Sequence, residues 1–367
     1  MKLFRFLEGT PAPTPAHTPE GLNPDRRRML AMGCACCAMV AGGISPAAAQ
    51  LPGVQSHLAA AKKAAGTDLL PYLRLGEVAD PAMADPKAMP RDQLMRLPAP
   101  PPGQAFDNLY FVGNKWVSAW VIATSQDLIL VDAMDNDDEA EHIIEAGMRR
   151  LGLNPAQIKM VIVTHGHGDH YGGVGYLRRR YAPAVHMGAP DWEMTATQLE
   201  FDRPDWGRPP VRNPATDLAL KDGDRLRLGD TAIDILMTPG HTMGTVSLLF
   251  SARQGSQVHR TLLWGGTSFN FGRQPNRMER LQAYIDATAR VRDVARAQNV
   301  DVFISNHNGF DQAVEKLALM QQTGQSQHPA RSRSANPFVI GADATQRALT
   351  VMHECAQATL VAWQSGK

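Results

Sequence analysis

The stretch VIVTHGHGDHYGG, from Val161 to Gly173, joins an apolar run to three histidines and an aspartate. The apolar start predicts a short buried strand. His165 and His167 are two positions apart, so both side chains can point the same way from an extended backbone, and the intervening glycines permit a sharp turn. Asp169 and His170 fall at the turn into the next helix, where they can face a second point nearby. This density of ligands predicts two neighbouring metal sites.

Two distant histidines complete these sites. His241 in ILMTPGHTMG and His307 in VFISNHNG each follow the end of a predicted strand, and strand ends are where α/β sheets place binding sites. A catalytic zinc takes three protein ligands and keeps one position open. We therefore expect two zinc ions per chain, one held by His165, His167 and His241 and the other by Asp169, His170 and His307.

The rest of the chain alternates short apolar runs with amphipathic helical patterns. This alternation predicts an α/β fold with helices covering the faces of sheets. Strands are expected over 109–113, 117–123, 127–133, 159–164, 184–188 and 300–306, and residues 224–240 are expected to form two strands joined at Gly229-Asp230. Helices are expected over 135–153, 172–181, 281–297 and 343–363.

The N-terminal region differs in composition. Three arginines at 26–28 precede a weakly apolar run that ends in three alanines, so residues 1–49 are interpreted as a twin-arginine-like signal peptide and the protein as exported to the periplasm. Residues 50–105 predict a lead-in that combines a short Ala/Lys helix with an extended Pro-rich stretch ending RLPAPPPGQ, which cannot be a strand. Residues 106–367 form the main domain, with its C-terminal helix over 343–363. Removal of the leader would leave Cys355 as the one cysteine and no internal disulfide.

The net charge and the hydropathy of the sequence limit the classes of partner that the protein can bind. The net charge is +1 and no basic stripe with interleaved aromatic residues is present, which argues against a nucleic-acid partner. The apolar run of the leader is shorter than a membrane span, so no stable membrane association is expected once it is removed. A small-molecule substrate fits best, and the sequence does not set the oligomeric state.

The histidine pattern resembles the signature of the metallo-β-lactamase superfamily, His-x-His-x-Asp-His followed by downstream histidines, over roughly 106–321. The resemblance implies a four-layer αβ/βα sandwich with the metals at the edge where the two sheets meet. Asp132, which ends the strand DLILVDA, matches the first motif of the family. By resemblance it orients the histidine loop.

One departure from the superfamily bears on the substrate. Many hydrolases of this superfamily have a metal-bridging aspartate in a Gly-Asp-Thr-like motif, where this chain has Gly265-Gly266-Thr267. The ligand set therefore looks most like the metallo-β-lactamase subclass with a three-His site and an Asp-His-His site. Thr267 is expected to hydrogen-bond a metal-bound water or the substrate, and Ser268 could serve equally. By the same resemblance, a substrate carboxylate would be held by Ser268, Asn270, Arg273 or Asn308.

These expectations combine into a zinc-dependent hydrolase in which a metal-bound hydroxide opens a carbonyl substrate. A cyclic amide of the β-lactam kind is the first candidate. A lactone or ester is the alternative, followed by an iron-dependent redox reaction. Asp169 has two possible roles, as ligand of the second metal and as acceptor of a proton. The loop 191–210, with Trp192, Phe201 and Trp206, is either an apolar lid over the site or a surface loop anchored by its aromatic residues.

Overall fold

The computed structural model describes residues 44–322 and 336–365. Every described residue belongs to one compact unit, which begins at Cys36. Most of the predicted leader, residues 1–43, and residues 323–335 lie outside the described residues. Within the described part, no helix combines the length and the apolar character needed to cross a membrane.

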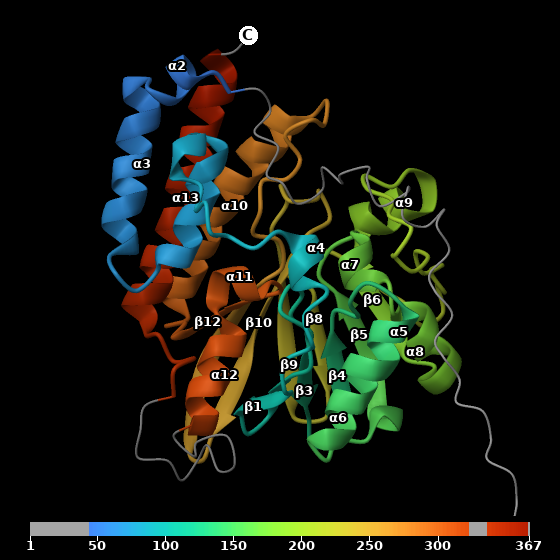
Figure 1. Cartoon of the computed structure of the whole chain (residues 1–367). Coiled ribbons are helices and arrows are strands. Elements are labelled where there is room, and N and C mark those ends of the chain that lie inside the picture. The colour runs from blue at the N-terminus through green and yellow to red at the C-terminus, as the bar shows by residue number, and fades with distance from the viewer. Residues whose placement is uncertain (1–43, 323–335, 366–367) are drawn as a thin grey trace, which may run out of the picture. The chain divides into compact units, whose positions relative to one another are not determined.

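Two β-sheets form the centre of this unit (Figure 1). The seven-stranded sheet follows chain order: β1 (Gly103–Phe106), β2 (Leu109–Phe111), β3 (Trp120–Ala123), β4 (Leu128–Val131), β5 (Ile158–Val163), β6 (Ala184–Gly188) and β7 (Ala219–Leu220). Strands β1 to β4 pair antiparallel and β4 to β7 pair parallel. Parallel pairing needs crossover segments, and these supply the helices on the outer face of this sheet.

The second sheet has five strands in the order β12-β11-β10-β9-β8. Its strands are β8 (Arg225–Leu228), β9 (Thr231–Met237), β10 (Val246–Gln254), β11 (Gln257–Trp264) and β12 (Val302–Ser305). The pairs are antiparallel except β11 with β12, which run parallel.

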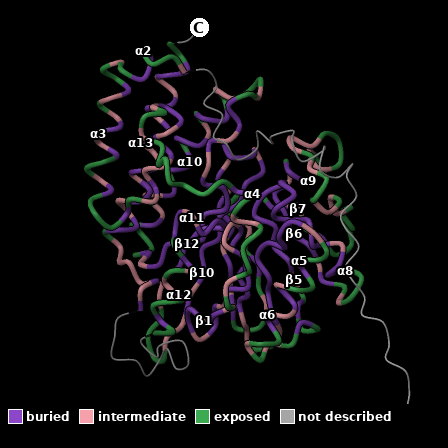
Figure 2. The backbone as a smooth tube through the Cα atoms, viewed as in Figure 1, coloured by how far each residue is buried: buried purple, intermediate pink, exposed green. Residues whose placement is uncertain are grey.

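Alternation of side chains along the strands produces the layers. In β5, Ile162 faces the core between the two sheets while Val161 and Val163 face the helices outside. In β10, Leu248 faces the same inter-sheet core and Leu249 faces the opposite helical layer. Figure 2 shows the sheets as the buried centre of the unit, with exposed residues gathered on the outer helices and loops.

Helices cover both outer faces (Figure 1). The seven-stranded sheet carries α5 (Asp137–Glu139), η3 (Ala140–Glu145), α6 (Ala146–Arg150), η4 (Pro155–Gln157), α7 (Gly168–Tyr171), α8 (Val174–Tyr181) and α9 (Ala189–Thr197). The five-stranded sheet carries α3 (Pro52–Ala65), η1 (Leu70–Val78), α10 (Arg277–Ala297) and α13 (Ala342–Ser365). The four-layer αβ/βα sandwich expected from the sequence is confirmed.

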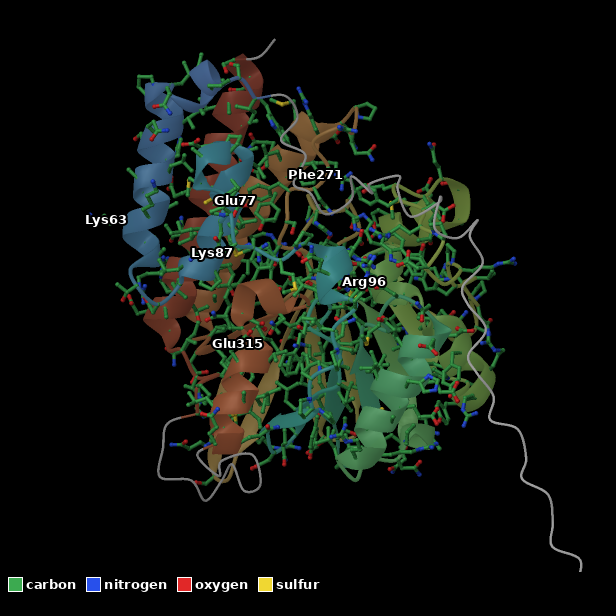
Figure 3. The ribbon with its side chains drawn as sticks, viewed as in Figure 1. Lys63, Glu77, Lys87, Arg96, Phe271 and Glu315 are labelled. Carbon is green, nitrogen blue, oxygen red and sulfur yellow. The ribbon has the colours of Figure 1, made fainter. Side chains whose placement is uncertain are left out.

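The short Ala/Lys helix expected in the segment 50–105 is present as α3, and more of the segment is helical than the extended lead-in predicted from its prolines. The prolines at the starts of α3 and η1 occupy first-turn positions, where no intrahelical N–H is needed. Val54 and Leu58 of α3 pack against Ala358 and Ala362 of α13, and Lys63 lies on the outward face of α3 (Figure 3). Strand β1 also begins within the Pro-rich stretch, at Gly103.

Short elements connect these layers. They are α2 (Pro46–Ala49), η2 (Pro81–Met83), α4 (Arg91–Leu94), α11 (Asn308–Asp311) and α12 (Ala313–Gln322). Near the C-terminus, Phe338 is buried and Val339 makes an isolated bridge with Val302 of β12. Cys355 is buried in α13 as a free thiol.

Candidate metal centre

The predicted ligands lie at the ends of strands from both sheets. His165 and His167 follow β5, and the short helix α7 that comes next carries Asp169 and His170. The remaining two, His241 and His307, follow β9 and β12. All six side chains are buried. The site therefore lies where the ends of the two sheets meet.

The first group consists of His165, His167 and His241. One ligand atom from each lies within 4.8 Å of the others, and Nε2 of His165 is 3.0 Å from Nε2 of His241. The ring of His167 is centred 4.7 Å from that of His165 and 4.9 Å from that of His241. Three imidazoles thus converge on one point.

The second group consists of Asp169, His170 and His307. Nε2 of His170 lies 3.1 Å from Nε2 of His307, and Oδ2 of Asp169 lies 3.5 Å and 3.8 Å from these two nitrogens. His165, Asp169 and His170 also place ligand atoms within 4.8 Å of one another, so the two groups are adjacent.

The ring nitrogens that face away from the site fix the orientation of four histidines. Nδ1 of each makes a hydrogen bond to an oxygen: His165 to the carbonyl of Gly265 at 2.8 Å, His170 to Asp132 at 2.8 Å, His241 to the carbonyl of Ser268 at 2.9 Å and His307 to the carbonyl of Trp116 at 3.0 Å. An imidazole that donates from Nδ1 presents a lone pair at Nε2. In the first group two Nε2 lone pairs therefore face each other, which suits a cation between them, whereas in the second group a protonated His170 can donate from Nε2 to His307.

His167 has the opposite orientation. Its Nε2 is bonded to Oε2 of Glu200 at 3.0 Å, which leaves Nδ1 for the site. Oε1 of Glu200 accepts from Arg280 at 2.7 Å, and Arg280 also donates to the carbonyls of Gly240 and His241. Glu200 and Arg280 were not predicted from the sequence, because no local motif marks either residue.

Asp132 holds the histidine loop from β4. It has φ +62°, a left-handed conformation that Asp tolerates better than most residues. Its carboxylate accepts from the backbone N–H of Thr164 at 2.8 Å, from the Thr164 hydroxyl at 2.9 Å and from Nδ1 of His170 at 2.8 Å. Asp132 thus orients a ligand and the strand end that precedes the ligands.

Asp191 provides a second anchor that the sequence did not suggest. Its buried carboxylate accepts from the N–H of Gly166 at 2.6 Å, from the N–H of Gly244 at 2.9 Å and from the hydroxyl of Thr242 at 2.6 Å. It ties the histidine loop after β5 to the turn that carries His241. Two loops from different sheets are therefore held in a fixed relation.

The pKa shifts of His165, His241, His307 and Asp169 favour the forms that bind a metal, whereas that of His170 favours the protonated form. Burial lowers the pKa values of His165 and His241 well below the ordinary value, and burial together with His170 lowers that of His307 to about 4. Burial alone would raise the pKa of Asp169, but the neighbouring histidines, above all His170, hold it well below its usual range. Burial opposes the charge on His170, yet Asp169 and Asp132 raise its pKa to about 10. A metal at the second group would therefore displace a proton.

The segment Gly265–Ser268 lies beside the first group. A Cβ atom at Gly266 would come within 2.7 Å of Cβ and 2.9 Å of Cγ of His241, so a side chain has no space there. The Thr267 hydroxyl is buried and lies 3.3 Å from the hydroxyl of Ser305. Ser268, and not Thr267, lines the pocket over the metal centre.

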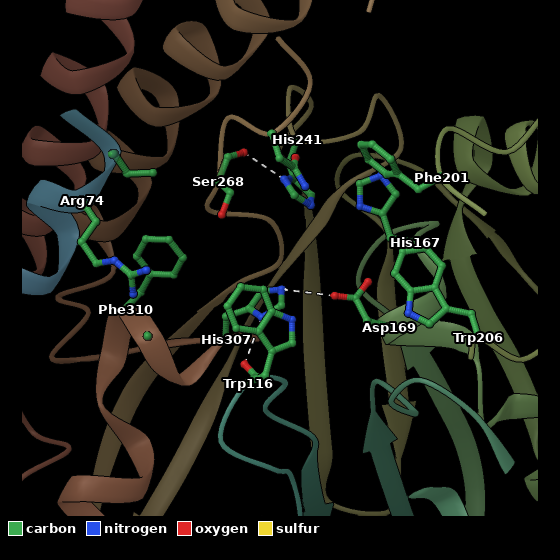
Figure 4. Close-up of a pocket in the computed structure, with 13 residues that line it drawn as sticks. Arg74, Trp116, His167, Asp169, Phe201, Trp206, His241, Ser268, His307 and Phe310 are labelled. Atoms are coloured by element: carbon green, nitrogen blue, oxygen red, sulfur yellow. Dashed lines mark hydrogen bonds and ion pairs between the residues drawn. The ribbon is translucent and has the colours of Figure 1, made fainter. Parts of the chain in front are cut away.

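That pocket opens above the ligands and has aromatic walls (Figure 4). Phe201 and Trp206 of the loop 191–210 line it, whereas Trp192 belongs to the core beneath the outer helices. Asn270 also lines the pocket, while Arg273 and Asn308 do not. Sequence reasoning missed five further lining residues, Arg74, Leu75, Trp116, Gly309 and Phe310.

Comparison with known proteins places this geometry in a family. Residues 115–254 match the family model described as "Metallo-beta-lactamase superfamily". A hydroxyacylglutathione hydrolase of Cereibacter sphaeroides is 31% identical over 122 residues, which are 33% of this chain and 41% of that protein. The chain thus spans less than half the length of this relative.

Solved structures match over a larger share of the chain. BJP-1, a subclass B3 metallo-beta-lactamase of Bradyrhizobium japonicum, is 27% identical with a TM-score of 0.55, and the match covers 68% of this chain and 90% of that one. MEM-A1, a subclass B3 metallo-beta-lactamase from a soil metagenome, is 25% identical with a TM-score of 0.58 and coverages of 73% and 98%. Two converging groups of metal ligands and the fold agree with the match of residues 115–254 to the metallo-beta-lactamase superfamily.

Proposed function

We propose that this protein is a zinc-dependent hydrolase that opens a carbonyl substrate, with a cyclic amide of the β-lactam kind as the first candidate. His165, His167 and His241 would hold one zinc ion, and Asp169, His170 and His307 would hold a second. Zinc in such a site polarises a carbonyl and activates water as a nucleophile at neutral pH.

One observation carries the proposal. Four imidazoles are fixed through Nδ1 so that their Nε2 atoms meet in two close pairs, at 3.0 Å and 3.1 Å. In the first pair, His165 and His241 are neutral and both donate from Nδ1, so neither Nε2 has a hydrogen for the other, although buried polar groups are normally hydrogen-bonded. Neutral imidazole is also the ligand that zinc prefers.

Other residues take supporting roles. Asp169, at the second group, is placed to accept a proton from the attacking water or to deliver it to the leaving group. Asp132 fixes the ring of His170, and Ser268 offers a hydroxyl to the substrate from the pocket wall. Thr267 would support that wall, because its hydroxyl contacts the hydroxyl of Ser305. Phe201 and Trp206 would keep bulk water from the bound substrate.

The choice of a cyclic amide rests on the segment at Gly266. Superfamily hydrolases that bridge their metals with an aspartate in a Gly-Asp-Thr motif need a side chain at this point. His241 occupies the space that such a side chain would require. The likeness to two subclass B3 metallo-beta-lactamases supports the same choice.

An ester or thioester is the second candidate, because curated relatives are named hydroxyacylglutathione hydrolase. The two candidates share the centre and differ in the leaving group. Comparison of the hydrolysis rates of a cyclic amide and an ester or thioester distinguishes the two candidates.

The test is metal analysis of the purified protein combined with hydrolysis assays on a β-lactam, a lactone and a thioester, each with and without chelator. About two zinc ions per chain and chelator-sensitive opening of the β-lactam are expected. Two zinc ions with turnover of the lactone or thioester alone would move the substrate to the second candidate. Iron in place of zinc, or no chelator-sensitive turnover of any of the three, would overturn the proposal.

We also propose that residues 1–49 direct export to the periplasm. The arginines at 26–28 ahead of a weakly apolar run support this. Replacing Arg26 and Arg27 by lysine should keep a tagged protein in the cytoplasmic fraction. Unchanged fractionation of this double variant would contradict a twin-arginine route.

A further inference from the structure

The metal centre lies in the middle of the pocket, and the walls on its two sides have no assigned role. The described lining residues include histidines and Asp169 at the metal centre, four aromatic side chains, and a single lysine or arginine, Arg74. Arg74 belongs to η1, in the segment that precedes the residues matched by the family model. It contributes a fixed positive charge to the pocket from outside the residues that carry the ligands.

The surroundings of Arg74 leave its charge available. Arg74 is half-buried, and among the described residues no carboxylate lies within ion-pair distance of it. The nearby carboxylate on the same helix is Glu77, whose pKa burial raises and the charge of Arg74 partly offsets. By contrast, Arg280, which also lies near the metal centre, is fully engaged by Glu200 and by backbone carbonyls.

The protein makes room for this side chain. Gly309, directly after the loop of His307, lies so close that a Cβ atom there would come within 2.8 Å of Nη1 of Arg74. Figure 4 shows Arg74 beside Phe310 on one side of the pocket and Phe201 with Trp206 on the other, with the histidines and Asp169 between them. A substrate at the metal centre can therefore extend toward Arg74 while Phe201 and Trp206 cover its other end.

The guanidinium of Arg74 suits an anionic ligand, because a guanidinium binds carboxylates in a two-pronged geometry.

We propose that Arg74 is a specificity-determining residue that holds a carboxylate of the substrate while the carbonyl to be cleaved lies at the metal centre. This rests on the proposed function and narrows its substrate class to carbonyl compounds that carry a carboxylate. The sequence had suggested Ser268, Asn270, Arg273 and Asn308 for this role. Of these four, two reach the pocket and neither carries a positive charge.

The kinetic test compares benzylpenicillin with its methyl ester, two β-lactams that differ in the carboxylate. Arg74→Ala should raise KM for the acid about tenfold or more, the range for a lost hydrogen bond to a charged group, and change kcat by less than about threefold. KM for the ester should move by less than about twofold. Arg74→Lys should recover part of the loss, because it restores the charge without the planar fork.

The matched control is Arg150→Ala, which removes the same charge from an exposed position at the end of α6. It should behave as the wild type with both compounds. Thermal unfolding of Arg74→Ala should match the wild type. A KM for the acid that is unchanged in Arg74→Ala, or raised equally for acid and ester, would overturn the inference.

A binding measurement separates this inference from the proposed hydrolysis. Metal-depleted protein is titrated with the acid and with the ester, and tryptophan fluorescence follows occupation of the pocket. The wild type should bind the acid more tightly than the ester, and Arg74→Ala should lose that difference. If metal-loaded wild type hydrolyses neither compound, the proposed function fails while this titration still decides the role of Arg74. Equal binding of acid and ester by the wild type would contradict that role.

Discussion

Glu200 accepts a hydrogen bond from Nε2 of His167 at 3.0 Å through one carboxylate oxygen and binds Arg280 at 2.7 Å through the other. Arg280 is buried in α10 and donates to the backbone carbonyl of His241. One ion pair therefore connects two of the three ligands in the first group. The same carboxylate lies next to Phe201, so it also joins the pocket wall to the metal centre.

Glu200→Gln should weaken zinc binding at the first group about 10- to 100-fold, because the amide holds the His167 ring less firmly and leaves Arg280 without a counter-charge. Competition with a chromophoric chelator measures the affinity. The spectrum of the cobalt-substituted protein should change at the same time, which a general loss of stability would not produce. Glu193→Gln, an exposed residue on α9, is the control. Wild-type affinity and spectrum in Glu200→Gln would contradict this positioning role.

His241→Asn and His307→Asn should separate the two sites. The first substitution should remove the ion of the first group, and the second should leave that ion in place and remove its neighbour. Turnover should fall more than about 100-fold in both, since a lost ligand costs more than a lost supporting contact. Zinc per chain and initial rates measure these effects. His142→Asn, at an exposed position, should leave both unchanged; full metal content in either ligand variant would refute the assignment.

Gly266→Ala should displace the imidazole of His241, because the new methyl group would lie 2.7 Å from Cβ and 2.9 Å from Cγ of that residue. We expect a loss of zinc from the first group and a matching loss of turnover. Gly175→Ala is the control, because a Cβ there meets only the end of the Arg179 side chain at 3.3 Å and the position is helical. Zinc content, rates and unfolding midpoints should distinguish the two substitutions. A Gly266→Ala variant that kept its zinc would show that the centre can shift to admit a side chain.

Asp311 should make stability depend on pH. It is buried and accepts from the N–H of Ser305 at 2.8 Å and of Ala313 at 3.1 Å, and burial raises its pKa to about 6 in spite of Lys316. Because the folded pKa exceeds the unfolded value near 4, the folded state binds the proton more tightly, and this stabilisation is lost as pH rises through 6.

The measurement is urea unfolding of metal-depleted wild type and Asp311→Asn at pH 5 and pH 7. The wild type should lose about 1 kcal/mol relative to the variant between these two pH values. Asp286→Asn, at an exposed position of α10, should show no such difference. A constant gap between wild type and Asp311→Asn would mean that the carboxyl has the same pKa in both states.

The main domain could be predicted largely from local pattern. The apolar runs of β4 and β5 mark two buried strands, and both are present, whereas β10 and β11 were not predicted. The extent of helix in the segment 50–105 could not be predicted in this way. Helices α3 and η1 are stabilised by packing against α13, which lies near the other end of the described chain. Prolines at the first turns of α3 and η1 resemble those of an extended segment until the partner helix is known.

Some residues of the metal centre could likewise be predicted from local motifs, and others could not. Its six proposed ligands were found because they sit in short motifs at strand ends. Glu200, Arg280 and Asp191 were missed because each acts across the fold, on a histidine or a turn far away in sequence. Arg74 was missed for a related reason: the helix that carries it lies outside the region of the motifs, and its position over Gly309 depends on packing alone.

The six ligands come from two halves of the chain that meet at the site. Four lie on or after β5 in the seven-stranded sheet, and His241 and His307 lie on the five-stranded sheet. The short turn from β7 to β8 connects these two halves of the chain. A chain cut in that turn would give two fragments, and neither fragment would hold all three ligands of either group. Zinc binding would therefore promote association of the two fragments. Such a pair would serve as a split sensor whose signal rises with free zinc.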